Sequence, residues 1–298
     1  MAVTTRDRKS HMTGDATDGS PATPAPRDGL VTFDNVSFGY DADGLVIIDD
    51  ISFSIAVGEV VTLLGASGCG KSTLLNMVAG LLSPRGGACL FEGAPIKGVN
   101  TGVGYMTQDD TLLPWRTVRA NIALPLRLRG VAKSDAAARI KTYLRLLNLE
   151  DAEKQFPAQL SGGMKRRALM ARTVIYEPRM ILMDEPFAAI DADLREDLHV
   201  EVRKMVAELR QTVLFVTHDI AEAALLSDRV VVLAGSPVAG IADIVDVPFG
   251  PDRDLDALRT SPELFEVQKT LRETLRTGQP ASGRRETAEG DGDSRDHD

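Results

Sequence analysis

The nine residues 65–73, with the sequence GASGCGKST, constrain the fold of this chain more than any other stretch. The apolar run at 60–64 predicts a buried strand before them, and the run at 73–80 predicts a helix after them. A glycine-rich loop in this position wraps its backbone N–H groups around phosphate, and the helix N-terminus adds its positive dipole end. The alternative is a glycine-rich turn with a lysine at a helix start. The flanking strand and helix favour the phosphate site.

Three residues of this loop have specific predicted properties. Lys71 reaches the β- and γ-phosphates of a nucleotide, and the Ser72 hydroxyl ligates Mg²⁺. Cys69 lies near Lys71 and the helix N-terminus, and both favour a thiolate; the alternative is a small residue that fills space. The predicted nucleotide-binding residues are Gly65, Ala66, Ser67, Gly68, Cys69, Gly70, Lys71, Ser72 and Thr73.

Composition narrows the class of protein. The 298 residues carry a formal net charge of −9, which argues against a nucleic-acid partner. No apolar run approaches the roughly 18 residues of a membrane span, and the N-terminus lacks the apolar core of a secretory signal. The two cysteines have no metal-ligand spacing, so we expect a reduced, intracellular protein without a zinc site or a disulfide scaffold.

Residues 1–29 and 277–298 contain few large apolar side chains and are expected to be disordered, the second as an acidic tail. One foldable domain of residues 30–276 lies between them. Alternating apolar residues predict antiparallel strands over 30–57. A helical block covers about 117–177, in which Ser134 suits an N-cap.

Later apolar runs at 180–183, 213–216 and 230–233 alternate with helical patterns. Strands that alternate with helices indicate a mainly parallel sheet flanked by helices, the α/β class. Two of these runs are followed by polar residues that could take part in catalysis: Asp184-Glu185 after the first and His218 after the second.

The phosphate loop is followed, in order, by Gln108, the segment Ser161-Gly162-Gly163 at a helix start, Asp184-Glu185, Asp191 and His218. Together these closely resemble the ATP-binding cassette (ABC) ATPases over residues 30–276. The resemblance implies a P-loop NTPase cassette with an antiparallel β subdomain and a helical subdomain. It also implies ATP and Mg²⁺ as ligands.

The resemblance assigns roles to these residues. Asp184 holds Mg²⁺ through water, and Glu185 orients or deprotonates the attacking water; alone, the pair would be a solvated strand end. Gln108 is similar to the glutamine that senses Mg²⁺ and water. His218 resembles the switch histidine that contacts the γ-phosphate, although a lone strand-end histidine is usually structural. Tyr40 matches the aromatic residue that stacks on adenine; its alternative is an ordinary core tyrosine.

Ser161, Gly162 and Gly163 resemble the family signature, which binds the γ-phosphate of ATP held by the other subunit. Asp191 lies in the loop that communicates between the two sites. With one cassette in the chain, the resemblance implies a head-to-tail homodimer with two ATP molecules at its interface.

The run 108–118, with 121–126, is similar to the nitrate/sulfonate/taurine branch of bacterial importers. This resemblance implies an ATPase that drives uptake of a small solute through a separate transmembrane permease, at the cytoplasmic face of the membrane. It also implies an extracytoplasmic solute-binding protein. Leu113, Pro114 and Trp115 are expected to form an exposed apolar patch that docks the permease; alternatively, Trp115 packs into the helical block.

Two other functions compete with the importer. A soluble cassette ATPase of translation or DNA maintenance usually has fused cassettes or long coiled-coil insertions, and this acidic chain has neither. A P-loop kinase or GTPase shares the phosphate loop, but the signature at Ser161 argues against it.

Overall fold

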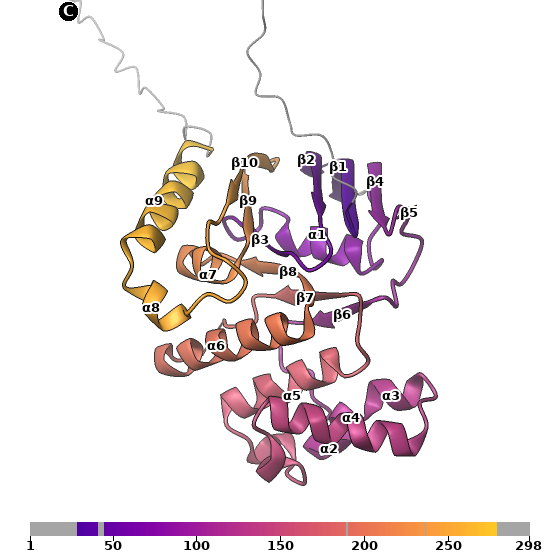
Figure 1. Cartoon of the computed structure of the whole chain (residues 1–298). Helices are drawn as coiled ribbons and strands as arrows, with labels where there is room; N and C mark the ends of the chain where they lie inside the picture. The colour runs from indigo at the N-terminus through magenta and orange to yellow at the C-terminus, as the bar shows by residue number, and fades with distance from the viewer. Residues whose placement is uncertain (1–28, 41–44, 189, 236, 279–298) are drawn as a thin grey trace, which may run out of the picture.

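The computed structural model describes residues 29–40, 45–188, 190–235 and 237–278. The termini expected to be disordered lie outside these residues, apart from Gly29, Thr277 and Gly278. Two sheets and a group of helices make up the described part (Figure 1).

An antiparallel sheet covers one side of the molecule. Its strand order is β2-β1-β4-β5, with bounds β1 (Val31–Tyr40), β2 (Leu45–Ile55), β4 (Gly86–Phe91) and β5 (Ala94–Pro95). Phe33 of β1 and Phe53 of β2 face each other and stack with ring centroids 4.6 Å apart. The predicted antiparallel strands of 30–57 are therefore confirmed.

A six-stranded sheet forms the centre, in the order β10-β9-β3-β8-β7-β6. Its first five strands in the chain are parallel: β3 (Val60–Leu64), β6 (Val103–Met106), β7 (Met180–Asp184), β8 (Thr212–Thr217) and β9 (Arg229–Ala234). The mainly parallel sheet predicted from the apolar runs is confirmed. The edge strand β10 (Gly240–Asp246), which runs antiparallel to β9, is not predicted by the sequence pattern.

Alternate residues of the central strands belong to two separate cores. Val61 and Leu63 of β3 pack in one core with α1 (Lys71–Val78) and the antiparallel sheet. Val60 and Leu64 pack in the other core with the remaining helices. Because the strands are covered on both faces, most of their positions are apolar, which explains why they form nearly continuous apolar runs.

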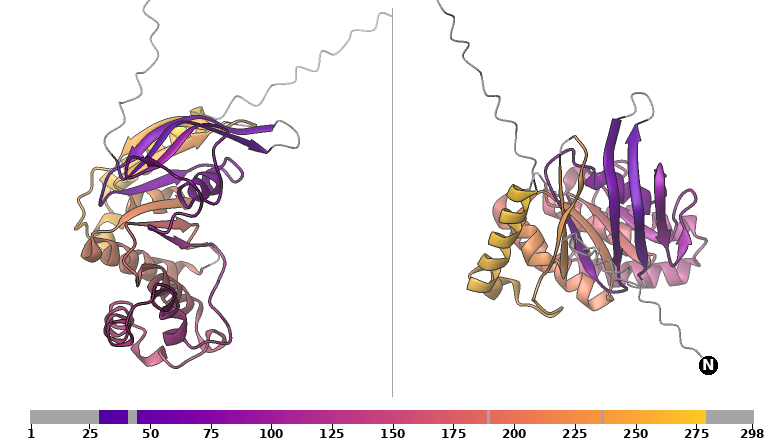
Figure 2. Two further views of the ribbon diagram at one scale, coloured as in Figure 1. Left: turned by 90° about the vertical axis from the view of Figure 1, so that its right-hand side faces the viewer. Right: turned by 90° about the horizontal axis from the view of Figure 1, so that it is seen from above.

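The helices of the second core fall into two groups. One group covers the sheet: α6 (Ala192–Leu209), α7 (Ile220–Leu226), α8 (Leu255–Arg259) and α9 (Pro262–Thr277). The other group forms a lobe at the β6 end of the sheet (Figures 1 and 2): α2 (Val118–Ile122), α3 (Leu124–Leu128), α4 (Lys133–Leu146) and α5 (Gly162–Val174), with 3₁₀ turns η1 (Glu150–Ala152) and η2 (Pro157–Gln159).

One expected helix boundary is wrong. Helix α4 begins at Lys133, so Ser134 lies inside its first turn and Ala132 is the N-cap. The Ser134 hydroxyl donates to the Asp135 carboxylate at 3.1 Å instead of capping a backbone N–H group.

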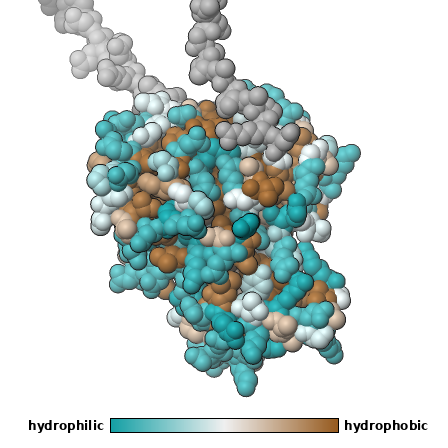
Figure 3. Space-filling model, in the orientation of Figure 1, coloured by the Kyte–Doolittle hydropathy of each residue, from teal (hydrophilic) through white to brown (hydrophobic). Residues whose placement is uncertain are grey.

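Among the described residues, no helix is long and apolar enough to cross a bilayer. On the face seen in Figure 3, the hydrophobic residues form separate patches among polar ones.

Candidate nucleotide site

The carboxyl ends of three adjacent parallel strands meet at one edge of the central sheet. β3 leads into the phosphate loop, its neighbour β8 ends at Thr217 before His218, and β7 ends at Asp184 before Glu185. In open α/β sheets this edge is where ligands bind. The topology therefore brings together residues that are more than 140 positions apart in the sequence.

The backbone of the phosphate loop requires glycine at its turning points. Gly68 and Gly70 have φ angles of 83° and 92°, in the left-handed region that favours glycine. A Cβ atom on Gly70 would lie 2.5 Å from Cγ1 of the fully buried Ile48. Gly70 is also the N-cap of α1, so its conformation directs the first N–H groups of the helix toward the loop.

Lys71, the first residue of α1, is folded back along the loop. Its Nζ donates to the backbone carbonyl oxygens of Gly65 and Ala66, at 2.8 Å each, and the side chain is buried. The positive charge therefore lies against the loop that precedes the helix, where the helix dipole also favours an anion. The loop, the helix start and Lys71 together fit a phosphate group.

The Ser72 hydroxyl donates to Asp184 Oδ1 at 3.0 Å, which joins the phosphate loop to the end of β7. Burial raises the pKa of Asp184, and the hydrogen bond from Ser72 opposes that shift. A hydroxyl and a carboxylate are hard oxygen ligands and fit Mg²⁺, which usually takes one or two carboxylates, phosphate oxygens and water. No cluster of three metal-ligating His, Cys, Asp or Glu side chains occurs in the described part of the chain.

Glu185 follows Asp184 with its backbone in the left-handed region, at a φ of 43°. Its backbone N–H donates to Val216 of the neighbouring strand at 3.0 Å, and this bond helps to hold the unusual conformation. Its Oε1 lies 3.2 Å from His218 Nδ1. Backbone strain of this kind tends to be kept where a side chain must point in one direction. The carboxylate and the imidazole thus form a pair at the same edge as Lys71.

The other predicted site residues lie at or near the ends of other strands and helices. Gln108 is exposed, two residues after β6. Asp191 caps α6 by accepting a hydrogen bond from the Leu194 backbone at 3.0 Å. Tyr40 ends β1, and its side chain lies outside the described residues.

The segment Ser161-Gly162-Gly163 begins α5, as predicted. The Ser161 hydroxyl accepts a hydrogen bond from the Met164 backbone at 3.3 Å, and a Cβ atom on Gly163 would lie 2.6 Å from Leu194 Cδ1. Figure 1 places α5 in the helical lobe and α1 beside the antiparallel sheet. Within one chain, the two glycine-lined helix starts therefore lie in different parts of the molecule.

The expectation that Cys69 is a thiolate is wrong. The Cys69 side chain is buried, and this burial raises the pKa of its thiol. The positive charge of Lys71 and its backbone hydrogen bond lower the pKa, but their effect is smaller than that of burial. Cys69 is therefore a buried, neutral thiol within the loop. Both Cys69 and Cys89 are free cysteines.

The sequence did not predict a role for the basic residues at 165–167, near the start of α5. Arg166 donates to the backbone carbonyl oxygens of Thr107 and Gln108, at 3.2 and 2.7 Å, and is buried while doing so. A run of basic residues after a helix start is the only sign in the sequence, and such a run is usually a solvated face.

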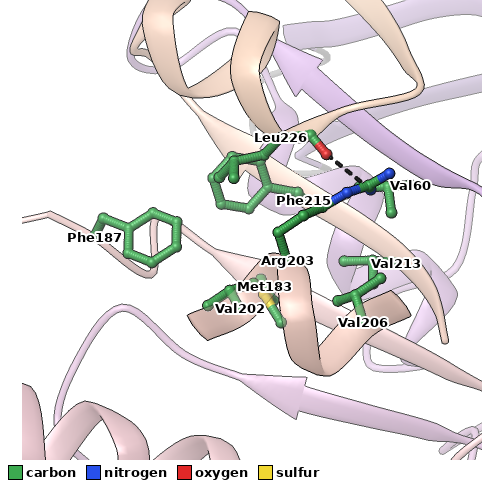
Figure 4. A pocket seen from close by; sticks show the side chains of 9 residues that line it. All are labelled: Val60, Met183, Phe187, Val202, Arg203, Val206, Val213, Phe215 and Leu226. Carbon is green, nitrogen blue, oxygen red and sulfur yellow. Dashed lines mark hydrogen bonds between the residues drawn. The ribbon is translucent and has the colours of Figure 1, made fainter. Parts of the chain in front are cut away.

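A small cavity lies between α6 and the central sheet (Figure 4). It is apolar except for Arg203, whose Nη1 donates to the Leu226 carbonyl at 3.3 Å. Such a lining does not suit a triphosphate. The lining residues are Val60, Met183, Phe187, Val202, Arg203, Val206, Val213, Phe215 and Leu226.

Comparisons with known proteins agree with this geometry. Residues 48–188 match the model of the ABC transporter family. The chain is 43% identical to an uncharacterized ABC transporter ATP-binding protein, MJ0412, of Methanocaldococcus jannaschii, over 73% of this chain and 80% of the relative. It is 38% identical to the nitrate import ATP-binding protein NrtD of Synechococcus elongatus, over 72% and 79%. It is 36% identical to the bicarbonate transport ATP-binding protein CmpD of Synechocystis, over 83% and 90%.

A solved structure has the same fold. The dimeric structure of MJ0796, a bacterial ABC transporter cassette, superposes with a TM-score of 0.64 at 26% identity, covering 74% of this chain and all of the other. The P-loop cassette fold predicted from the motifs is therefore confirmed. This chain belongs to the ATP-binding proteins of ABC transporters and is an ATPase of that family.

Proposed function

We propose that this protein is the ATP-hydrolysing subunit of an importer that takes up a small solute of the nitrate type through a separate permease. The ATPase part of the proposal is supported by one observation. Lys71, the Ser72–Asp184 pair and the Glu185–His218 pair all lie at one edge of the central sheet. The importer part is supported by the likeness to relatives named for nitrate import and bicarbonate transport.

In this proposal the loop N–H groups and Lys71 bind the phosphates of ATP, and Ser72 and Asp184 hold Mg²⁺. When bound, Mg²⁺ neutralises charge on the phosphate oxygens. The Glu185 carboxylate accepts a hydrogen bond from the attacking water and takes its proton, while His218 orients that carboxylate and reaches the γ-phosphate. Gln108 senses the metal and the water, and Tyr40 stacks on adenine.

The site of one chain requires a second copy. Ser161, Gly162 and Gly163 lie at a helix N-terminus in the helical lobe and, in this proposal, bind the γ-phosphate of ATP held by a partner cassette. The proposed assembly is a head-to-tail homodimer with two ATP molecules, and Asp191 lies at its interface. Support comes from the related cassette MJ0796, whose structure is dimeric. Closure on ATP and reopening after hydrolysis drive the permease because the two states differ in their affinity for ATP.

The proposed permease contact is the loop at Leu113, Pro114 and Trp115. Trp115 is 71% exposed, so the alternative in which it packs into the helical block is wrong. The buried Asn121 side chain holds this loop in place: it accepts from the Leu113 backbone N–H at 2.7 Å and donates to the Leu113 carbonyl at 3.1 Å. An exposed tryptophan on a hydrogen-bonded loop supports a protein contact, because tryptophan is enriched among the residues that dominate interface energies.

The remaining parts of the proposal follow from the importer role. The protein would bind peripherally at the cytoplasmic face of the membrane, and an extracytoplasmic binding protein would deliver the solute. A soluble cassette ATPase of translation or DNA maintenance is the alternative, and such a protein would retain no permease.

Changing Trp115 to serine tests the importer role. We expect the amount of permease retained by the tagged protein from detergent-solubilised membranes to fall about tenfold or more, because a buried aromatic anchor often contributes 2 kcal/mol or more to an interface. The measurement is quantitative mass spectrometry of the copurified polytopic membrane protein. Phe265→Ser is the matched control, since Phe265 is 60% exposed on α9, in a different helix group. Equal retention by both variants, or no permease with the unchanged protein, would contradict the proposal.

A further inference from the structure

The loop that contains Gln108 is attached to α5 by arginine side chains. Arg166 donates from Nη1 to the Thr107 carbonyl at 3.2 Å and from Nη2 to the Gln108 carbonyl at 2.7 Å. Arg172 donates to the carbonyl and the hydroxyl of Thr111, at 2.7 and 2.6 Å. Four hydrogen bonds thus connect two positions of one helix to both ends of the segment 107–111.

Charge and burial make this attachment strong. Arg166 is 8% exposed, and its guanidinium fork matches two consecutive carbonyl groups, which a lysine ammonium cannot do. Asp109 and Asp110, in the same loop, oppose the lowering of the Arg166 pKa that burial causes. Lys165 adds a longer contact, with Nζ 3.9 Å from Asp110. Hydrogen bonds from a charged donor are stronger than neutral ones.

The same helix carries the signature. Ser161 caps α5, Arg166 lies five positions later and Arg172 eleven positions later, so the helix spans about 16 Å between the cap and the second arginine. A continuous helix of this length is stiff compared with the loop. The signature and the attachment points of the Gln108 loop therefore belong to one rigid element.

The other end of the loop is also held. Asn121 fixes Leu113, and the Thr117 hydroxyl caps α2 by accepting from the Ala120 backbone at 3.3 Å. Between these points the chain displays Trp115. The segment 107–117 is thus fastened to the helical lobe at both ends, although Gln108 itself follows a strand of the central sheet.

We propose that Arg166 and Arg172 are positioning residues that fix the backbone of the Gln108 loop to α5, so that Gln108 and Trp115 move as one unit with Ser161–Gly163. The proposal rests on the proposed function for the role of Gln108 in hydrolysis and of Trp115 in docking. Neither arginine is proposed to touch ATP. Their loss should therefore slow turnover while leaving the affinity for ATP nearly unchanged.

The experiment compares Arg166→Met and Arg172→Met with the unchanged chain and with Arg145→Gln. Arg145 is the matched control because it lies in the same lobe, on α4, is 67% exposed in its side chain, and pairs only with Glu150 in the described contacts. Trp115 is the single tryptophan of the chain, so its fluorescence anisotropy and its quenching by acrylamide report on this loop alone. ATP hydrolysis is measured in parallel over a range of ATP concentrations.

We expect Arg166→Met to lower kcat about 10- to 100-fold with KM changed less than about threefold, as for a small misplacement of a reacting group. Both Met variants should lower the anisotropy of Trp115 and increase its quenching in the absence of nucleotide. Arg166→Lys should keep part of kcat, because it retains the charge and one of the two bonds. Arg145→Gln should match the unchanged chain.

Unchanged Trp115 anisotropy in both Met variants, or a kcat of Arg166→Met equal to that of the unchanged chain, would overturn the proposal. If Arg166→Met fails to fold by circular dichroism, the half-exposed Arg172→Met gives the same test. The fluorescence is recorded without nucleotide and without permease. Failure of the importer role would therefore appear as missing permease in the membrane experiment, while the anisotropy difference would persist.

Discussion

Replacing Glu185 with glutamine is expected to lower kcat for ATP hydrolysis about 10²- to 10⁴-fold, the usual contribution of a general base. The amide has nearly the same shape as the carboxylate and still accepts a hydrogen bond, but it cannot take a proton at neutral pH. Glu185 directly follows Asp184, which accepts a hydrogen bond from Ser72. Its backbone is in the left-handed region, and its carboxylate lies beside His218. In the proposed site the loop and Lys71 bind ATP, and Glu185 does not, so we expect the Kd for ATP to change less than about threefold.

Phosphate release at saturating ATP and equilibrium binding of a fluorescent ATP analogue are the two measurements. Glu208→Gln is the control, because Glu208 is a half-exposed carboxylate on α6 that pairs with Lys204 within its own helix. If Glu185→Gln hydrolysed ATP at a rate within about threefold of the unchanged protein, the assignment of the general base would be wrong.

Replacing Lys71 with methionine is expected to weaken ATP binding about 100-fold or more. Methionine fills a similar volume but removes the cation that lies against the loop, where its Nζ now contacts the Gly65 and Ala66 carbonyl oxygens. Hydrogen bonds to charged groups contribute about 1.5–3 kcal/mol, and about 2.7 kcal/mol corresponds to a 100-fold change in Kd.

Isothermal titration with ATP in the presence of Mg²⁺ measures this effect. Lys204→Met, an exposed substitution on α6, is the control for the loss of one positive charge. A thermal melt without nucleotide separates weaker binding from unfolding, since a folded Lys71→Met protein should melt within a few degrees of the unchanged chain. Retention of full affinity by the folded variant would show that Lys71 does not hold the phosphates.

The central fold could be predicted because its local signals are strong and consistent. Strands β3 and β7 are mostly apolar because both of their faces are covered, and each leads into polar residues that meet at one edge. The loop at Gly65 to Gly70 has few alternatives because positive φ angles at Gly68 and Gly70 need glycine. The roles of single residues came from the family resemblance rather than from these patterns.

Other features depend on contacts that no local pattern encodes. Strand β10 is half-exposed and lacks a clear alternation of buried and exposed residues, so its pairing with β9 decides its structure. The protonation of Cys69 depends on burial under the loop, which outweighs the nearby lysine. Arg166 reaches a loop 58 positions away, and its neighbour Lys165 has the same charge, so only the orientation of α5 distinguishes a positioning residue from a surface cation.

Sedimentation velocity of the Glu185→Gln protein with and without Mg-ATP tests whether two copies of the chain share each nucleotide. We expect a monomer without nucleotide and a stable dimer with two bound ATP molecules when nucleotide is saturating, because each triphosphate would then be bound by Lys71 of one copy and Ser161 of the other. A protein that binds ATP fully and still sediments as a monomer would contradict this expectation.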